Sequence, residues 1–327
     1  MLTAHGSLLI SIVLVLLTAH CLRLNVSAQV LEPADKITID SDLVNLNVSV
    51  FNRNPGQSNP TLRQNDFIIY ENGVRQDISF FAPAEAPFDL VLLLDLSGST
   101  ADKIGLVKKS AKRFVEAARP NDRIAVVTFT ADVAVVSTLT SDHEALNRSI
   151  DAIKKTGGGT NFWDALRFVL EHLLGQTRAE RRRGAVIVMT DGVDNALPGV
   201  FGDGSSTSFE ELIGIVRRAD TIILPIYLDT EKDSNSHNMP HSAYLMAQEQ
   251  LAMLAAESGN QVYQARKLKD LDGVYVQVIR DLSTTYSIGY RPRNLDRDGS
   301  WRNVSVQLIG HSDLAVRTRQ GYYASRP

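Results

Sequence analysis

Four runs of apolar residues constrain the fold of this chain most strongly. They lie at residues 90–95, 124–129, 185–191 and 221–229, and each is nearly continuous instead of alternating with polar residues. Strands that are buried on both faces have this pattern, because helices cover both sides of a parallel sheet. The runs therefore predict the strands of a buried, mainly parallel sheet.

The segments between these runs have the period of amphipathic helices. In residues 103–119 the apolar side chains fall on one stripe and lysines lie opposite. Residues 162–174 and 243–257 have the same pattern. Strands that alternate with helices predict the α/β class, here a doubly wound, mainly parallel sheet spanning residues 87–284.

The flanking segments, residues 29–86 and 285–327, have β character instead. Residues 67–81 predict two strands around an Asn72-Gly73 turn, because both turn residues tolerate positive φ. Neither flank has enough strands for a stable domain of its own. We expect the two to pair into one smaller all-β sandwich, with the α/β domain inserted between them. Two independent β segments packed on the α/β domain are the alternative.

The amino-terminal segment has the features of an export signal. Residues 8–19 form a short apolar run, and Val26 and Ala28 are small residues at the spacing that a signal peptidase recognises. We predict a signal peptide over residues 1–28, cleaved before Gln29, and hence a secreted or periplasmic protein without a membrane span in its mature form. An uncleaved membrane anchor is the alternative, although the run is shorter than the ~18 residues that span a bilayer.

Composition excludes several classes of partner and chemistry. The chain has 327 residues and a formal net charge of −3, so nothing indicates binding to nucleic acid or to an anionic membrane. Cys21 is the only cysteine and lies in the predicted signal peptide. The mature protein would therefore use neither disulfides nor thiol chemistry.

Oxygen-bearing side chains follow two of the predicted buried strands. Asp95 ends the first apolar run and is followed by Ser97 and Ser99, and Asp191 ends the third run. Ligands of open α/β sheets bind in the crevice outside the carboxyl ends of the strands. These side chains are therefore placed to share one site.

A glycine-rich segment supplies a fifth oxygen. Three glycines precede Thr160, and they allow the backbone to turn sharply and approach a ligand closely. Two carboxylates and three hydroxyls suit a small divalent cation, Mg²⁺ or Mn²⁺, which prefers oxygen ligands and keeps some of its waters. Ordinary structural roles are the alternative: Asp95 could cap the following turn, and the three hydroxyls could cap the helices that follow them.

Together, the segments DLSGS, GGGT and TDGVDN resemble the von Willebrand factor type A (VWFA) domain. The metal-ion-dependent adhesion site (MIDAS) of that family has the pattern D-x-S-x-S, then a threonine and then an aspartate, each on a separate loop. The resemblance covers about residues 87–284. The flanks, LRQNDFIIYENGVRQDISFF and YSIGYRP with WRNVSVQL and VRTRQGYYA, resemble those of bacterial exported VWFA-related proteins.

The resemblance implies a role for each residue. Ser97 and Ser99 would coordinate the metal directly, and Thr160 and Asp191 directly or through water. Asp95 would act mainly through water. An Asp or Glu carboxylate of a partner protein would fill the last position. The chain is thus expected to be a non-enzymatic adhesion or protein-binding module.

Two other functions fit part of the pattern. A Mg²⁺-dependent hydrolase or phosphoryl-transfer enzyme could use Asp95 as its nucleophile. Such enzymes usually need a second acid two residues later, where this chain has Ser97, and a cationic side chain that holds the phosphate. A scaffold whose metal only stabilises the fold is the third possibility. The sequence specifies neither the partner nor the oligomeric state.

Overall fold

The computed structural model describes residues 43–54, 57, 60–100, 103–154, 157–175, 182–231, 239–265 and 271–326. The predicted signal peptide, with Cys21 and the cleavage site before Gln29, lies outside the described residues.

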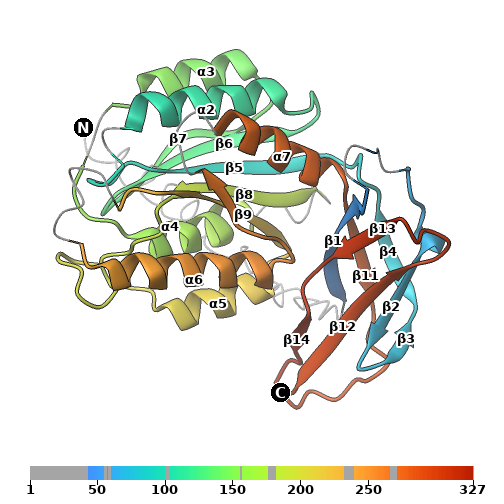
Figure 1. Ribbon diagram of the computed structural model, residues 1–327. Coiled ribbons are helices and arrows are strands. Elements are labelled where there is room, and N and C mark those ends of the chain that lie inside the picture. Colours follow the sequence, from blue (N-terminus) through green and yellow to red (C-terminus); the bar gives the residue numbers. More distant parts are fainter. Residues whose placement is uncertain are drawn as a thin grey trace, which may run out of the picture. The chain divides into compact units, whose positions relative to one another are not determined.

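A six-stranded sheet forms the centre of the α/β part, in the order β10-β9-β8-β5-β6-β7 (Figure 1). Its strands are β5 (Phe88–Asp95), β6 (Arg123–Phe129), β7 (Val133–Thr140), β8 (Arg183–Thr190), β9 (Thr221–Leu228) and β10 (Tyr263–Ala265). All neighbours are parallel except β6 and β7. The chain begins in the middle at β5, adds β6 on one side and later adds β8 on the other. The predicted doubly wound, mainly parallel α/β fold is confirmed.

Helices cover both faces of this sheet (Figure 1). One face carries α2 (Ile104–Ala117), α3 (His143–Ala152) and α7 (Leu271–Ser283), and the other carries α4 (Phe162–Phe168), the π-helical turn η3 (Val169–Leu173), α5 (Phe209–Arg218) and α6 (His241–Glu257). The sequence patterns predicted α2, α6 and the α4–η3 segment. They did not single out α3, α5 or β10, although the apolar residues of α5 lie on one face and are buried there (Leu212, Ile213, Ile215 and Val216).

The arrangement of β5 explains why its sequence is a continuous apolar run. Leu90, Leu92 and Leu94 pack in the core beneath α2 and α7, while Val91 and Leu93 point into the core on the opposite face. Successive side chains of a strand point to opposite faces, so a strand covered on both sides must be apolar at every position.

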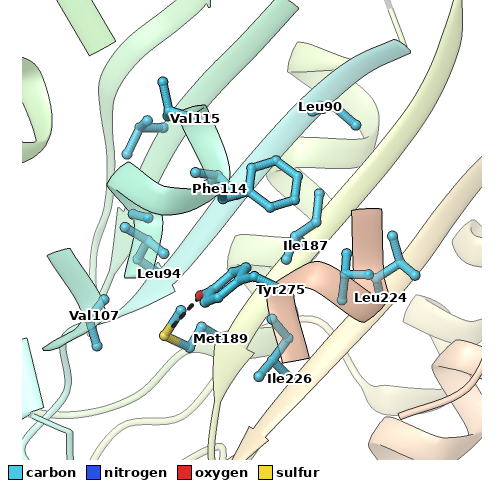
Figure 2. Packing of buried hydrophobic residues seen from close by; sticks show 14 of the residues in the cluster. Leu90, Leu94, Val107, Phe114, Val115, Ile187, Met189, Leu224, Ile226 and Tyr275 are labelled. Atoms are coloured by element: carbon cyan, nitrogen blue, oxygen red, sulfur yellow. Dashed lines mark hydrogen bonds between the residues drawn. The ribbon is translucent and has the colours of Figure 1, made fainter. Parts of the chain in front are cut away.

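Two aromatic side chains fill the core between α2, α7 and the sheet. Figure 2 shows Phe114 of α2 and Tyr275 of α7 among the side chains of β5, β8 and β9. Their ring centroids are 6.0 Å apart, and the Tyr275 hydroxyl contacts the Met189 sulfur at 3.7 Å. Met189 lies two residues before Asp191, so this core directly supports the end of β8.

The flanking segments form two four-stranded antiparallel sheets, in the orders β13-β1-β11-β4 and β14-β12-β2-β3. Their elements are β1 (Val44–Asn52), the short helix η1 (Gln64–Asp66), β2 (Phe67–Glu71), β3 (Val74–Gln76), β4 (Ile78–Ala82), β11 (Thr285–Tyr290), β12 (Trp301–Leu308), β13 (Leu314–Arg317) and β14 (Gly321–Tyr323). The amino-terminal strand β1 pairs with β11 and β13, and β2 pairs with β12. The predicted sandwich of both flanks is confirmed. The boundaries drawn at residues 86/87 and 284/285 stay a prediction.

The segment around Asn72-Gly73 differs from its prediction in one respect. Asn72 and Gly73 have φ values of 47° and 80° and join β2 to β3, as expected for this hairpin. The second predicted strand, however, is divided at Asp77. Residues after Asp77 form β4, which pairs with β11 in the other sheet. An apolar run shows that a strand is present, but not that it stays in one sheet.

Arg183, at the start of β8, connects both places where the chain passes between the α/β part and the sandwich. Its buried guanidinium donates hydrogen bonds to the carbonyl oxygens of Ala84, Ala86 and Thr285. It also lies over the Phe88 ring, 3.8 Å from the centroid. Burial lowers the pKa of Arg183 to about 9, so the side chain stays charged at neutral pH.

None of the helices in the described part of the chain combines the length and the apolar character required to cross a membrane.

Replacing Phe114 by alanine tests the core beneath α2. We expect Phe114→Ala to lower the free energy of unfolding by ~3–5 kcal/mol, because the buried ring leaves a cavity between α2, α7 and the sheet. Val276→Ala is the control, since Val276 is 58% exposed on α7; it should change stability by less than ~0.5 kcal/mol. Chemical denaturation gives both values, and equal effects would contradict the core assignment.

Candidate metal-binding site

The residues of the predicted site lie at the carboxyl ends of two adjacent central strands. Asp95 is the last residue of β5, and Ser97 and Ser99 follow it directly. Asp191 is the first residue after β8. Because β5 and β8 are parallel neighbours, their carboxyl ends lie side by side where the strand order reverses.

Hydrogen bonds join four of the five predicted residues. The Ser99 hydroxyl donates to Asp191 Oδ2 at 2.6 Å, and the hydroxyls of Ser97 and Ser99 are 3.3 Å apart. Asp95 Oδ1 accepts the backbone N–H of Ser97 at 2.9 Å, so this carboxylate also shapes the turn after β5. The loop after β5 and the loop after β8 therefore form one group of oxygen atoms.

Thr160 reaches the same region through its backbone. The N–H of Gly98 donates to the carbonyl oxygen of Gly158 at 3.2 Å, which holds the glycine-rich loop against the loop after β5. The backbone of Thr160 pairs with Asn195 through its N–H at 3.1 Å and its carbonyl oxygen at 2.9 Å. The Thr160 side chain is 6% exposed, and its hydroxyl makes no hydrogen bond to any residue that the structure describes. It is thus not bonded to the other four side chains.

Helix capping does not account for the three hydroxyls. The N-cap residue of α2 is Lys103, so neither Ser97 nor Ser99 has this position. The N-cap residue of α4 is Asn161, one residue after Thr160. The hydroxyls are therefore available for another role.

Two threonines that the sequence analysis missed complete the surroundings. The Thr190 hydroxyl donates to Asp95 Oδ2 at 2.5 Å, and the Thr230 hydroxyl donates to Asp191 Oδ2 at 2.6 Å. Both side chains are fully buried. The sequence could have indicated both residues, because each threonine adjoins an aspartate at the end of an apolar run. They fix the orientation of both carboxylates.

The two buried carboxylates of the site would be stabilised by a nearby positive charge. Asp95 and Asp191 are 0% and 1% exposed, and neither forms an ion pair with any described lysine or arginine. Burial, and then the negative charge of Asp191, raises the pKa of Asp95 to about 7. Burying ionised carboxylates without a nearby cation lowers the stability of the folded state by several kcal/mol.

A divalent ion fits this set of donors. Every side chain in the set contributes oxygen, as Mg²⁺ and Mn²⁺ prefer, and two carboxylates would balance the charge of the ion. The Thr160 hydroxyl, which has no hydrogen-bonding partner among the described residues, would be available as a further ligand. Elsewhere in the described ranges, no cluster of three or more His, Cys, Asp or Glu side chains could hold a metal.

The loop after β8 has further polar residues that serve its conformation. The Asp194 carboxylate accepts hydrogen bonds from the backbone N–H groups of Trp163, Ala196 and Ser205 at 2.9–3.0 Å. It therefore holds the loop against the amino terminus of α4. Asp194 is thus a loop-shaping residue.

Comparison with known proteins agrees with this geometry. Residues 89–275 match the von Willebrand factor type A domain, which is more than half of the chain. The chain belongs to the VWFA family. The matched range contains all five predicted site residues of this VWFA domain.

Individual relatives of the VWFA chain are distant. A protein of Borreliella burgdorferi, described as uncharacterized, is 31% identical over 120 residues. The aligned part is 33% of each protein, so this chain spans about a third of the length of that relative.

Two solved structures are similar to the VWFA chain at low identity. One is the vWF domain of the type V pili tip protein Mfa5 from Porphyromonas gingivalis (14% identical, 60% of this chain and 94% of that chain, TM-score 0.45). The other is proximal thread matrix protein 1 from the mussel byssus, with a zinc-occupied MIDAS motif (17% identical, 61% of this chain and 48% of that chain, TM-score 0.45).

The raised pKa of Asp95 predicts an effect of pH on the metal-free protein. The pKa of Asp95 is higher in the folded chain than its ordinary value of 3.8, so the folded state binds the proton more tightly. This group therefore favours folding at low pH, and the contribution is lost as the pH rises through about 7. Asp95→Asn removes the charge, so in chelator we expect it to stabilise the protein by ~1–4 kcal/mol at pH 8 and by little near pH 4.

Denaturation at several pH values measures this difference. Asp132→Asn, at an exposed turn, is the control and should have a small effect at both ends of the range. A difference between wild type and Asp95→Asn that is the same at all pH values would contradict the assignment.

Proposed function

We propose that this chain is an exported, metal-ion-dependent adhesion or protein-binding module. The observation that carries the proposal is the pair of buried carboxylates, Asp95 and Asp191, which have no ion-pair partner among the described residues and are surrounded by hydroxyls. A divalent cation, Mg²⁺ or Mn²⁺, would be held by Asp95, Ser97, Ser99, Thr160 and Asp191. The proposed secreted or periplasmic location rests on the signal-like sequence of residues 1–28.

The residues of the chain have distinct tasks in this proposal. The hydroxyls of Thr190 and Thr230 hold the two carboxylates in place, so the oxygen atoms need little rearrangement to accept a cation. When bound, the cation supplies positive charge and a coordination position for an oxygen of another molecule. Ser99 is half-buried, whereas Asp95, Ser97 and Asp191 are buried, so the site is accessible from the side of Ser99.

A protein carboxylate is the partner chemistry that suits such a site. The other ligands from the chain would be neutral hydroxyls, which donate less charge to a hard cation than a carboxylate does, so a carboxylate would fill an open coordination position better than a neutral oxygen. An Asp or Glu of a partner protein is therefore the proposed ligand. Water can replace it, so the contact would be strong yet reversible.

The structure gives little support to the enzymatic alternative. Asp95 is fully buried, and both of its carboxylate oxygens accept hydrogen bonds from Ser97, Thr100 or Thr190. A nucleophile needs an accessible oxygen atom with a free electron pair.

Metal binding should be measurable as stabilisation. With Mg²⁺ at 100 times its Kd, we expect the wild-type free energy of unfolding to rise by about 2.7 kcal/mol. Asp191→Ala should abolish this gain, and Thr160→Ala should weaken metal binding by about tenfold. Asp132→Ala, which removes an exposed carboxylate outside the site, is the matched control and should behave like wild type.

Isothermal titration calorimetry of the same four proteins, with Mn²⁺ as a second ion, gives the affinities directly. A wild-type protein that binds neither ion, or an Asp132→Ala variant that loses binding as Asp191→Ala does, would refute the site.

Recognition of an acidic side chain is tested with random peptides displayed on phage. We expect peptides captured by the Mg²⁺-loaded protein and released by chelator to be enriched in Asp or Glu. An Asp191→Ala protein should capture none of them. Replacing the acidic residue of a selected peptide by its amide should weaken binding by about tenfold or more. A captured pool without acidic enrichment would refute the proposed ligand.

A further inference from the structure

Phe201 is the most exposed large hydrophobic residue in the described part of the chain, at 85%. It lies in the 191–208 loop, which begins with the candidate metal ligand Asp191 and ends at α5. A single exposed apolar residue is common on protein surfaces and needs no explanation by itself. The position of Phe201 relative to the candidate site is what distinguishes it.

The loop that carries Phe201 is held firmly on both sides of it. Before Phe201, the side chains of Val193 and Leu197 are buried in the core beneath α4 and α6. After it, the Ser205 hydroxyl donates to Asp194 Oδ2 at 2.6 Å. Asp164 of α4 accepts the backbone N–H of Ser206 at 2.8 Å. The backbone on each side of Phe201 is thus fixed by the fold, although the Phe201 ring itself is exposed.

Asn195 connects Phe201 to the candidate metal site. Its side-chain oxygen accepts the N–H of Thr160 at 3.1 Å, and its side-chain nitrogen donates to the carbonyl oxygen of Phe201 at 3.1 Å. Gly202 has φ of +106°, and a Cβ there would lie 2.5 Å from the same Asn195 nitrogen. One amide therefore holds the Phe201 backbone next to a candidate metal ligand, and the close approach requires glycine.

An exposed aromatic side chain on a fixed backbone is well suited to bind a partner protein. An aromatic side chain on a fixed backbone loses little entropy on binding, and buried aromatic residues dominate the energetics of many protein interfaces. The charged residues nearest to Phe201 in the sequence are Asp194, Asp203 and Glu210; all are acidic, and Asp203 and Glu210 are exposed. They disfavour an anionic membrane and favour a protein partner.

We propose that Phe201 is an apolar anchor beside the metal site, so that the partner presents an apolar side chain or pocket next to the acidic residue. This inference rests on the proposed function. It adds a second recognition element, and it names the partner as a protein segment in which an acidic and an apolar group lie close together.

The phage selection described above tests the inference when it is repeated with Phe201→Ala in the full chain. Peptides selected on wild type should carry Leu, Ile, Met, Val or an aromatic residue near the acid. Those selected on Phe201→Ala should keep the acid and lose the apolar enrichment. For one wild-type-selected peptide, Phe201→Ala should weaken binding by about tenfold or more, and Phe201→Leu by less.

Leu295→Ala is the matched control, because Leu295 is 72% exposed and lies in the sandwich; it should change peptide binding by less than about twofold. The Mg²⁺ affinity and the thermal midpoint should be the same in wild type and Phe201→Ala, since Phe201 supplies no metal ligand and is not packed in the core.

The outcomes separate the two proposals. Acidic enrichment without apolar enrichment, unchanged in Phe201→Ala, overturns the anchor and leaves the proposed function intact. A pool without chelator-released acidic peptides overturns both. Metal-independent binding of wild type, but not of Phe201→Ala, to vesicles of phosphatidylcholine and phosphatidylglycerol also overturns the anchor, because Phe201 would then insert into lipid.

Discussion

Two carboxylates lie buried side by side at the centre of the candidate site, and no described lysine or arginine pairs with either of them. Asp95 and Asp191 lie at the ends of neighbouring parallel strands, where helices on both faces exclude water. Their hydrogen-bond donors are hydroxyls and backbone N–H groups, which orient the carboxylates but do not neutralise them. A fold that maintains this arrangement does so at a cost in stability, and a bound cation would offset that cost.

The loops around the carboxylates are fixed to one another as well as to the sheet. Gly98 bonds to Gly158, and Asn195 bonds to Thr160, so the three loops form one connected surface. The same asparagine holds the backbone at Phe201. Recognition by such a surface would require little reorganisation, which favours affinity because less entropy is lost on binding.

Side-chain hydrogen bonds join the sandwich to the α/β part, in addition to the two chain crossings. Arg183 donates to carbonyl oxygens at both crossings, and the Arg319 side chain of the sandwich donates to the carbonyl oxygen of Arg217, at the end of α5, at 3.2 Å. Asp281 of α7 accepts hydrogen bonds from Tyr263 and Arg317. Because the sandwich needs strands from both flanks, an insertion of the α/β part between them brings the ends of that part together.

Local patterns in the sequence were sufficient for the fold class and for the choice of candidate ligands. Continuous apolar runs identified the central strands, and the spacing of Asp95, Ser97 and Ser99, with Thr160 and Asp191, identified the loops. The residues that donate hydrogen bonds to the two carboxylates were not predicted. Thr190 and Thr230 were overlooked because a hydroxyl beside an aspartate is common, and only its direction makes it a donor to a particular carboxylate. The division of the strand at Asp77 was likewise missed.

Local sequence patterns were enough to predict the buried central strands, three of the helical segments and the oxygen-bearing residues of the candidate site, because hydrophobic period and short motifs are local properties. Tertiary packing was needed to show that Thr190 bonds to Asp95, that Thr230 bonds to Asp191, and that the Asn195 side chain links the backbones of Thr160 and Phe201. These contacts join residues of separate strands and loops. They depend on the order and register of β5, β8 and β9, which are set by packing between segments distant in the chain.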